Sequence, residues 1–83
     1  TSLFESLSET LEFGRELTYL REHRNPQINA VMAQKENRAR GGRLLEVFVV
    51  APVLEQIASD QNMDEPVRRR ARAILEYAQA KGE

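Results

Sequence analysis

Apolar and acidic residues alternate with helical spacing over residues 3–23. Ser2 and Glu5 have the spacing of a capping box, and Gly14 indicates either close approach of a neighbouring helix or a tolerated cost of about 1 kcal/mol. The glutamates lie on one half of the helical wheel: Glu5, Glu9, Glu12 and Glu16. The apolar residues lie on the other half: Leu3, Phe4, Leu7, Leu11, Phe13, Leu17 and Leu20. This pattern predicts an amphipathic helix.

A second helix is predicted over 26–40, with Asn25 as its N-cap and Pro26 at its first position. Gly41-Gly42 ends it, because one glycine suits the left-handed position that follows many helices. Its apolar stripe is narrow and can cover a core without forming one: Ile28, Val31, Met32 and Ala39.

The segment 43–58 is apolar on all sides, as expected for a helix buried on most of its faces. The valines of 47–50 also favour a strand, and the residue before Pro52 is biased toward extended backbone. A strand needs a partner, and no other segment has strand character. We therefore predict a helix that is kinked or restarted at Pro52.

A fourth helix is predicted over 65–81, after a turn at 60–63, with Asn62 or Asp64 as its cap. Its apolar face carries Val67, Ala71, Ile74, Leu75 and Ala78, with Tyr77 at the edge. The four segments predict an all-α fold, a compact bundle of about four helices in one domain over 1–83. The predicted core contains Leu7, Leu11, Leu17, Phe48, Leu54, Ile57, Ile74 and Leu75.

Charge alternates along the chain, although the net charge is only −1. Residues 1–23 carry −3, residues 24–43 carry +4, residues 44–66 carry −5 and residues 67–83 carry +3. This alternation favours packing of acidic helices beside basic ones. The small net charge argues against general attraction to nucleic acid or to an anionic membrane.

Several targeting and stability features are missing from the sequence. It contains no cysteine, so packing must hold the core without disulfides. No apolar run is long enough to span a membrane, and no signal-peptide pattern is present. We expect a cytoplasmic protein, and we expect from the initial Thr1 that an upstream piece was removed.

Few residues are suited to catalysis or to metal binding. His23 is the only histidine, and its position at a helix C-terminus suits the helix dipole. The row of glutamates opposes the apolar face, where a solvated surface fits better than an acid–base pair. We predict no enzyme activity, no cofactor and no tight binding of a divalent transition metal.

Two arginine clusters are candidate sites for a partner or a phosphate. Arg38, Arg40 and Arg43 surround the two glycines, where the next helix begins; the alternative is a plain helix cap with solvated arginines. The second cluster opens the last helix, where its charge opposes the dipole and needs an acidic neighbour or a nucleic-acid backbone: Arg68, Arg69 and Arg72.

These observations favour a non-enzymatic protein–protein interaction module, a small regulatory or adaptor protein that self-associates. Its third helix has more apolar surface than the other helices can cover, so we expect a homodimer interface at Val49, Val50 and Val53. The alternative is a small nucleic-acid-binding regulator that uses arginines 38–43 and 68–72. Arginines gathered on one face would favour the alternative, whereas arginines dispersed among glutamates would favour the interaction module.

Overall fold

The computed structural model describes residues 3–82, and their side chains over 7–80. Within this part the chain forms four helices and no strand: α1 (Leu3–Glu22), α2 (Ile28–Arg40), α3 (Leu44–Ser59) and α4 (Glu65–Gly82). The all-α bundle predicted from the sequence is therefore confirmed, including a helix over 44–50. The proposed cap at Ser2–Glu5 and the apolar positions Leu3 and Phe4 involve residues whose side chains lie outside the described part.

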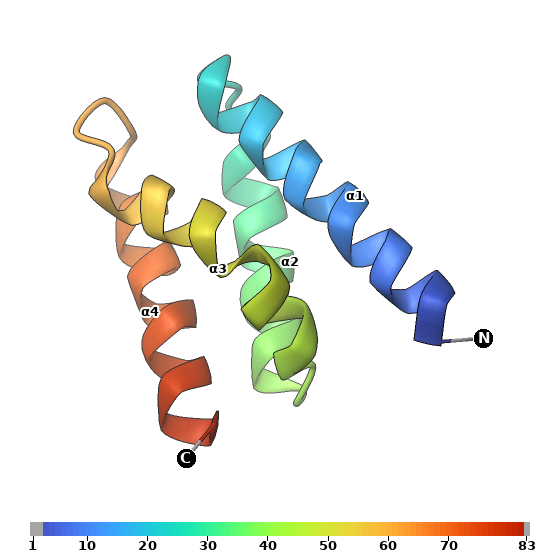
Figure 1. Ribbon diagram of the computed structural model, residues 1–83. Coiled ribbons are helices and arrows are strands. Elements are labelled where there is room, and N and C mark those ends of the chain that lie inside the picture. Colours follow the sequence, from blue (N-terminus) through green and yellow to red (C-terminus); the bar gives the residue numbers. More distant parts are fainter. Residues whose placement is uncertain (1–2, 83) are drawn as a thin grey trace.

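The helices α2 and α3 lie between the two outer helices. The helix α4 packs against both of them, and α1 packs against α3 and, less extensively, against α2. No contact joins α1 to α4 over the described residues, and Figure 1 shows these helices on opposite sides of the molecule. The N-terminal end of α1 extends away from the other helices (Figure 1).

Pro52, where we predicted a kink or a restart, lies inside α3, and the helix continues through it. Figure 1 shows the ribbon of α3 bending midway along its length. The bend follows from Pro52, because proline has no N–H to donate to the preceding turn and its ring displaces the carbonyl four residues before.

Left-handed residues end the first two helices. Gly42 has φ of +92°, and the amides of Gly42 and Arg43 bond to the carbonyls of Ala39 and Arg38. This is the Schellman pattern, and it confirms the glycine stop predicted after the second helix. Arg24 takes the corresponding position after α1 with φ of +47°, although arginine carries a Cβ that disfavours this conformation.

The start of α2 differs from the prediction. The helix begins at Ile28, and the residue before it, Gln27, makes no side-chain cap. Asn25 instead accepts a hydrogen bond from the amide of Gln27 at 2.9 Å, in the turn that leads into α2. The side chain of Asn25 thus accepts the hydrogen bond that we expected of a helix cap. However, Pro26 lies in the turn before α2 and not in the helix.

The core is formed by one side of every helix, and most of the predicted apolar faces are buried. Leu17, Leu54, Ile57 and Ile74 are buried as predicted, together with Leu20, Ile28, Met32, Val47, Val50, Val67 and Ala71. The predictions for Leu11 and Phe48 are wrong: these residues are 52% and 51% exposed. Leu11 of α1 and Phe48 of α3 lie on sides of these helices that no other described helix covers. Leu7 and Leu75 are only partly buried.

The expectation that acidic helices pack beside basic ones holds only in part. The acidic helix α3 packs most extensively against the basic helix α4, but helices of like net charge pack together as well. The acidic helices α1 and α3 contact each other, and so do the basic helices α2 and α4. Ion pairs across these interfaces use a residue whose charge is opposite to the net charge of its own helix. Arg21 of the acidic α1 pairs with Asp60 after α3, and Glu36 of the basic α2 pairs with Arg70 of α4. Individual ion pairs therefore join the helices of like net charge.

Candidate functional site

Two neighbouring surface features could bind a partner, one apolar and one charged. The first is a groove of about 350 Å³ between α1 and α3, lined mainly by apolar or small residues. Leu11, Gly14 and Thr18 form its α1 side, and Val49 and Val53 lie on its α3 side. The helices approach closely here, since a Cβ on Gly14 would lie 3.4 Å from Val50. Close approach is therefore the better account of Gly14.

Large exposed apolar side chains lie on both helices that form this groove. Leu11, Leu45 and Phe48 are each more than half exposed. With Val49 and Val53, which are partly buried, they form what we call the apolar strip. Of the three valines predicted at an interface, Val50 is 1% exposed and belongs to the core, so only Val49 and Val53 remain available at the surface.

A buried ionic cluster lies beside the strip, where α1, α2 and α3 meet. Lys35 of α2 is fully buried, and its Nζ lies 2.5 Å from Oε1 of Glu46 in α3. Nη1 of Arg38 lies 2.7 Å from the same oxygen. The ring of Phe13 in α1 covers this cluster, with Lys35 Nζ 3.5 Å from its centroid, in cation–π geometry.

The cluster perturbs both of its titratable groups. Burial lowers the pKa of Lys35 below its ordinary value and outweighs the hydrogen bond that Lys35 donates to Glu46, which raises the pKa. Burial would raise the pKa of Glu46, but hydrogen bonds from Lys35 and Arg38 outweigh it, so the net pKa falls below 4.5. The pair is thus a structural ion pair whose two members depend on each other.

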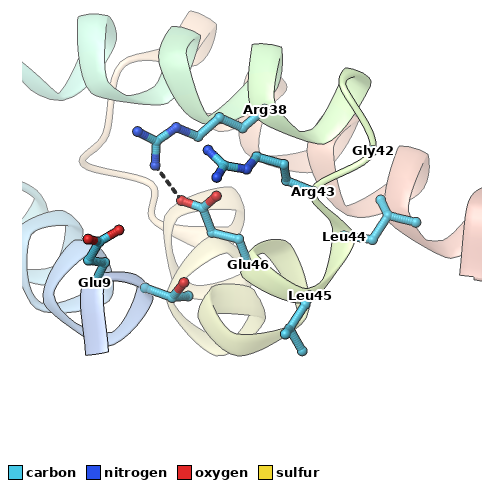
Figure 2. A pocket seen from close by; sticks show the side chains of 8 residues that line it. Glu9, Arg38, Gly42, Arg43, Leu44, Leu45 and Glu46 are labelled. Carbon is cyan, nitrogen blue, oxygen red and sulfur yellow. Dashed lines mark hydrogen bonds and ion pairs between the residues drawn. The ribbon is translucent and has the colours of Figure 1, made fainter. Parts of the chain in front are cut away.

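The second surface feature, which we call the basic pocket, opens above this cluster. It has a volume of about 330 Å³ and lies between the N-terminal half of α1, the end of α2 and the start of α3. Figure 2 shows the guanidinium groups of Arg38 and Arg43 near each other above Glu46, with Glu9 across the pocket. Thr10 lines both the pocket and the apolar groove, so the two features adjoin.

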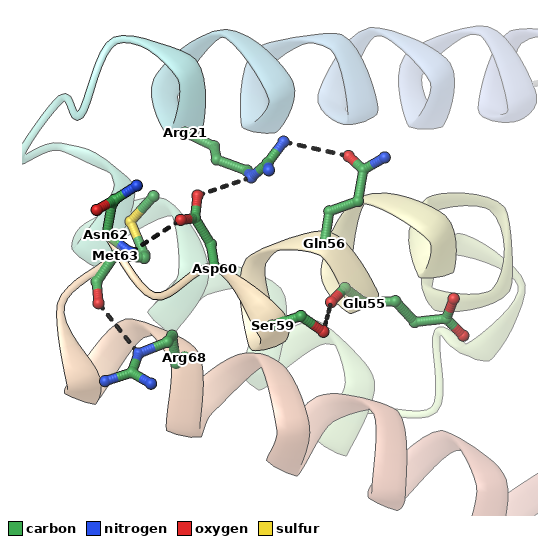
Figure 3. A network of polar contacts seen from close by, with 8 residues as sticks. All are labelled: Arg21, Glu55, Gln56, Ser59, Asp60, Asn62, Met63 and Arg68. Atoms are coloured by element: carbon green, nitrogen blue, oxygen red, sulfur yellow. Dashed lines mark hydrogen bonds and ion pairs between the residues drawn. The ribbon is translucent and has the colours of Figure 1, made fainter.

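The structure disperses the predicted arginine clusters. Arg40 pairs with Glu36, Arg69 pairs with Glu65, and Arg72 donates to the carbonyl of Ala58. Arg68 donates to the carbonyl of Met63 at the turn before α4, on the side where Arg21 and Asp60 join α1 to that turn (Figure 3). Only Arg38 and Arg43 of the six candidates come together, in the basic pocket.

His23 is the remaining single candidate for metal or acid–base chemistry. His23 is exposed, with its Nδ1 2.9 Å from the Tyr19 carbonyl and its ring stacked on that tyrosine. Among the described residues, no three histidine or carboxylate groups gather as metal ligands would. None of the described helices is long and apolar enough to cross a membrane.

Sequence reasoning missed Lys35 and Glu46, although both leave a signal. Lys35 falls at the spacing of Ile28, Met32 and Ala39, on the one stripe of α2 that faces the core. Glu46 is the only charge in the apolar run 44–54. Because Lys35 and Glu46 carry opposite charges on core-facing sides of two helices, the sequence contained enough information to predict that they form a buried ion pair. No protein-family model, curated protein or solved structure matches this chain.

Proposed function

We propose that this chain is a non-enzymatic, helical protein–protein interaction module, a small regulatory or adaptor domain that self-associates as a two-fold dimer through the apolar strip. The observation that carries this proposal is the exposure of Leu11, Leu45 and Phe48 beside the groove between α1 and α3. Exposed apolar surface is unfavourable by about 25 cal/mol per Å². A contiguous patch of this kind is typical of an interaction site.

A second copy is the occupant that the strip itself suggests. A two-fold axis brings the same patch of two copies together, so one apolar surface covers the other without a separate complementary partner. The strip contains no charge, whereas its borders carry Arg15 and Glu55, which can form a polar rim around an apolar centre.

Dispersal of the arginines weighs against the alternative function in nucleic-acid binding. Binding along a phosphate backbone uses several lysines or arginines on one face. Here three arginines of α4 contact three different neighbours. Arg70 pairs with Glu36, Arg72 donates to the carbonyl of Ala58, and Arg68 donates to the carbonyl of Met63. Their charges support packing of the helices, which favours the interaction module.

Sedimentation equilibrium tests the dimer over a wide range of protein concentration. We expect Phe48→Asp to weaken dimerisation by at least about a hundredfold, since a central apolar anchor contributes about 2 kcal/mol or more and each dimer loses two. Val49→Asp should act in the same direction. Helical content, followed by circular dichroism, should remain close to that of the wild type because these side chains are not fully buried.

Tyr19→Asp is the matched control, because Tyr19 is as exposed as Phe48 but lies on α1 away from the groove. It should leave the dimer intact. A wild-type chain that remains monomeric at high micromolar concentration would refute the proposal. Equal weakening by Tyr19→Asp and Phe48→Asp would refute the location of the interface.

A further inference from the structure

The basic pocket is lined by two arginines and two glutamates, and the fully buried Lys35 adds a third cation beside Glu46. One carboxylate oxygen of Glu46 serves two cations, Lys35 and Arg38. Arg43 lines the same pocket, is exposed, and makes no ion pair with any side chain of the described range 7–80. The other acid of the pocket, Glu9, lies on the opposite wall at the exposed surface of α1.

The cations act on one another across this small volume. Arg38 and Arg43 both lower the pKa of Lys35, which shows that all three charges share one electrostatic environment. With the buried Lys35 counted, three cations accompany the two carboxylates of the pocket, so a single added negative charge would neutralise the set. Partial burial strengthens such an interaction, because the pocket walls exclude part of the water that screens surface charges.

We propose that the basic pocket binds an oxyanion, a carboxylate or phosphate group, held between the guanidinium groups of Arg38 and Arg43. Guanidinium presents several N–H donors in a planar fork that matches the oxygen spacing of both groups. Arg38 uses Nη1 for Glu46 and is still 34% exposed, so other donors of its guanidinium remain accessible. Arg43 offers its complete set of donors.

The size of the pocket indicates that the oxyanion belongs to a larger ligand. A volume of about 330 Å³ exceeds what one such group needs, and it leaves room for the part that carries the group. Leu44 and Leu45 supply an apolar wall for that part. The proposal does not depend on dimerisation, since the pocket is formed within one chain.

Titration of the ¹⁵N-labelled full chain with sodium phosphate tests the site, with ionic strength held constant by sodium chloride. We expect saturable shifts of the amide signals of Gly42 and Leu45, which lie in the pocket. Arg43→Gln should weaken phosphate binding by at least about fivefold, because it removes one charge-assisted contact. Arg69→Gln is the matched control: it removes another exposed arginine, from α4 outside the pocket, and binding should not change.

Glu9→Gln makes the test sharper because its expected sign is opposite. Removing this carboxylate leaves the pocket with one more uncompensated positive charge, so phosphate should bind about two- to fivefold more tightly. A parallel titration with sodium acetate distinguishes the sources of the oxyanion. Saturation by acetate alone would indicate a carboxylate ligand, and saturation by phosphate alone would indicate a phosphate ligand; either supports the proposal.

Three results would overturn the inference. Shifts that grow linearly with both anions, without saturation, would show general salt effects. Equal affinities of the Arg43→Gln and Arg69→Gln variants for phosphate would show that phosphate binds elsewhere. Weaker phosphate binding by the Glu9→Gln variant than by the wild type would contradict the charge balance. Sedimentation of the Arg43→Gln variant should still give the wild-type dimer affinity, so failure here is distinguishable from failure of the self-association proposal.

Discussion

Replacing Lys35 by methionine tests the role of the buried ionic cluster in holding α2 against α3. Methionine keeps an unbranched chain of similar length under the ring of Phe13, but it leaves Glu46 with Arg38 as its only cation. Loss of one partner from a buried ion pair typically costs about 3–5 kcal/mol when the other charge stays uncompensated. Because Arg38 remains at 2.7 Å, we expect Lys35→Met to lower the free energy of unfolding by about 2–3 kcal/mol.

The double variant Lys35→Met with Glu46→Leu should recover most of this loss. It removes both buried charges together, and apolar replacements of buried pairs are often neutral within about 1 kcal/mol or stabilising. Arg38 then loses its partner, but its partly exposed side chain can be hydrated. We therefore expect the two substitutions to be strongly non-additive, with a coupling of about 1.5 kcal/mol or more.

Urea unfolding followed by circular dichroism measures these differences at fixed protein concentration. In a domain of this size, about 2 kcal/mol corresponds to roughly 8–16 °C in Tm. Arg40→Met provides the control, because Arg40 is 62% exposed and its pair with Glu36 is long, at 3.4 Å, so that the pair contributes at most about 1 kcal/mol. The reasoning is refuted if Lys35→Met costs no more than Arg40→Met, or if the double variant loses the sum of the single losses.

Two further predictions follow from local geometry and charge. Arg24→Gly should stabilise the protein by about 0.5–1 kcal/mol in thermal unfolding, because glycine adopts the left-handed φ at the end of α1 without strain. A loss of stability would show that the contacts of the arginine side chain contribute more than its strained backbone costs. Stability should fall on acidification, because the pKa of Glu46 is below 4.5 in the folded chain and the unfolded chain binds this proton first. Its contribution is complete above pH 4.5 and is lost as pH falls through the folded-state pKa, so Glu46→Gln should show a shallower pH dependence of the urea midpoint.

Helix positions could be predicted from the sequence because each boundary has a local chemical cause. Gly42 takes the left-handed backbone that ends α2, and Pro52 lies inside α3, whose ribbon bends midway along its length (Figure 1). The strand propensity of residues 47–50 is overridden because all of the described chain around them is helical and offers no edge for pairing.

The exposure of Leu11 and Phe48 could not be predicted in the same way. Periodicity shows which side of a helix is apolar, but it does not show how many neighbours cover that side. Leu11 lies on the same apolar half of α1 as Leu17, yet only Leu17 is buried. Net charge was an incomplete guide to packing, because the acidic helix α3 packs against both basic α4 and acidic α1. Single pairs such as Arg21 with Asp60 act at short range, while summed charges are screened.

The position of the apolar strip follows from how α1 crosses the other helices. Leu17 and Leu20, in the C-terminal half of α1, are buried, and Arg21 ties this end to Asp60. Toward its N-terminus α1 extends away from the bundle, and the apolar contact gives way to the ionic cluster under Phe13 (Figure 1). Because α4 contacts α2 and α3 but not α1 in the described chain, no helix remains to cover Leu45 and Phe48 on this side. At the apolar strip the described helices therefore leave apolar side chains uncovered, and our proposal is that a second chain covers them.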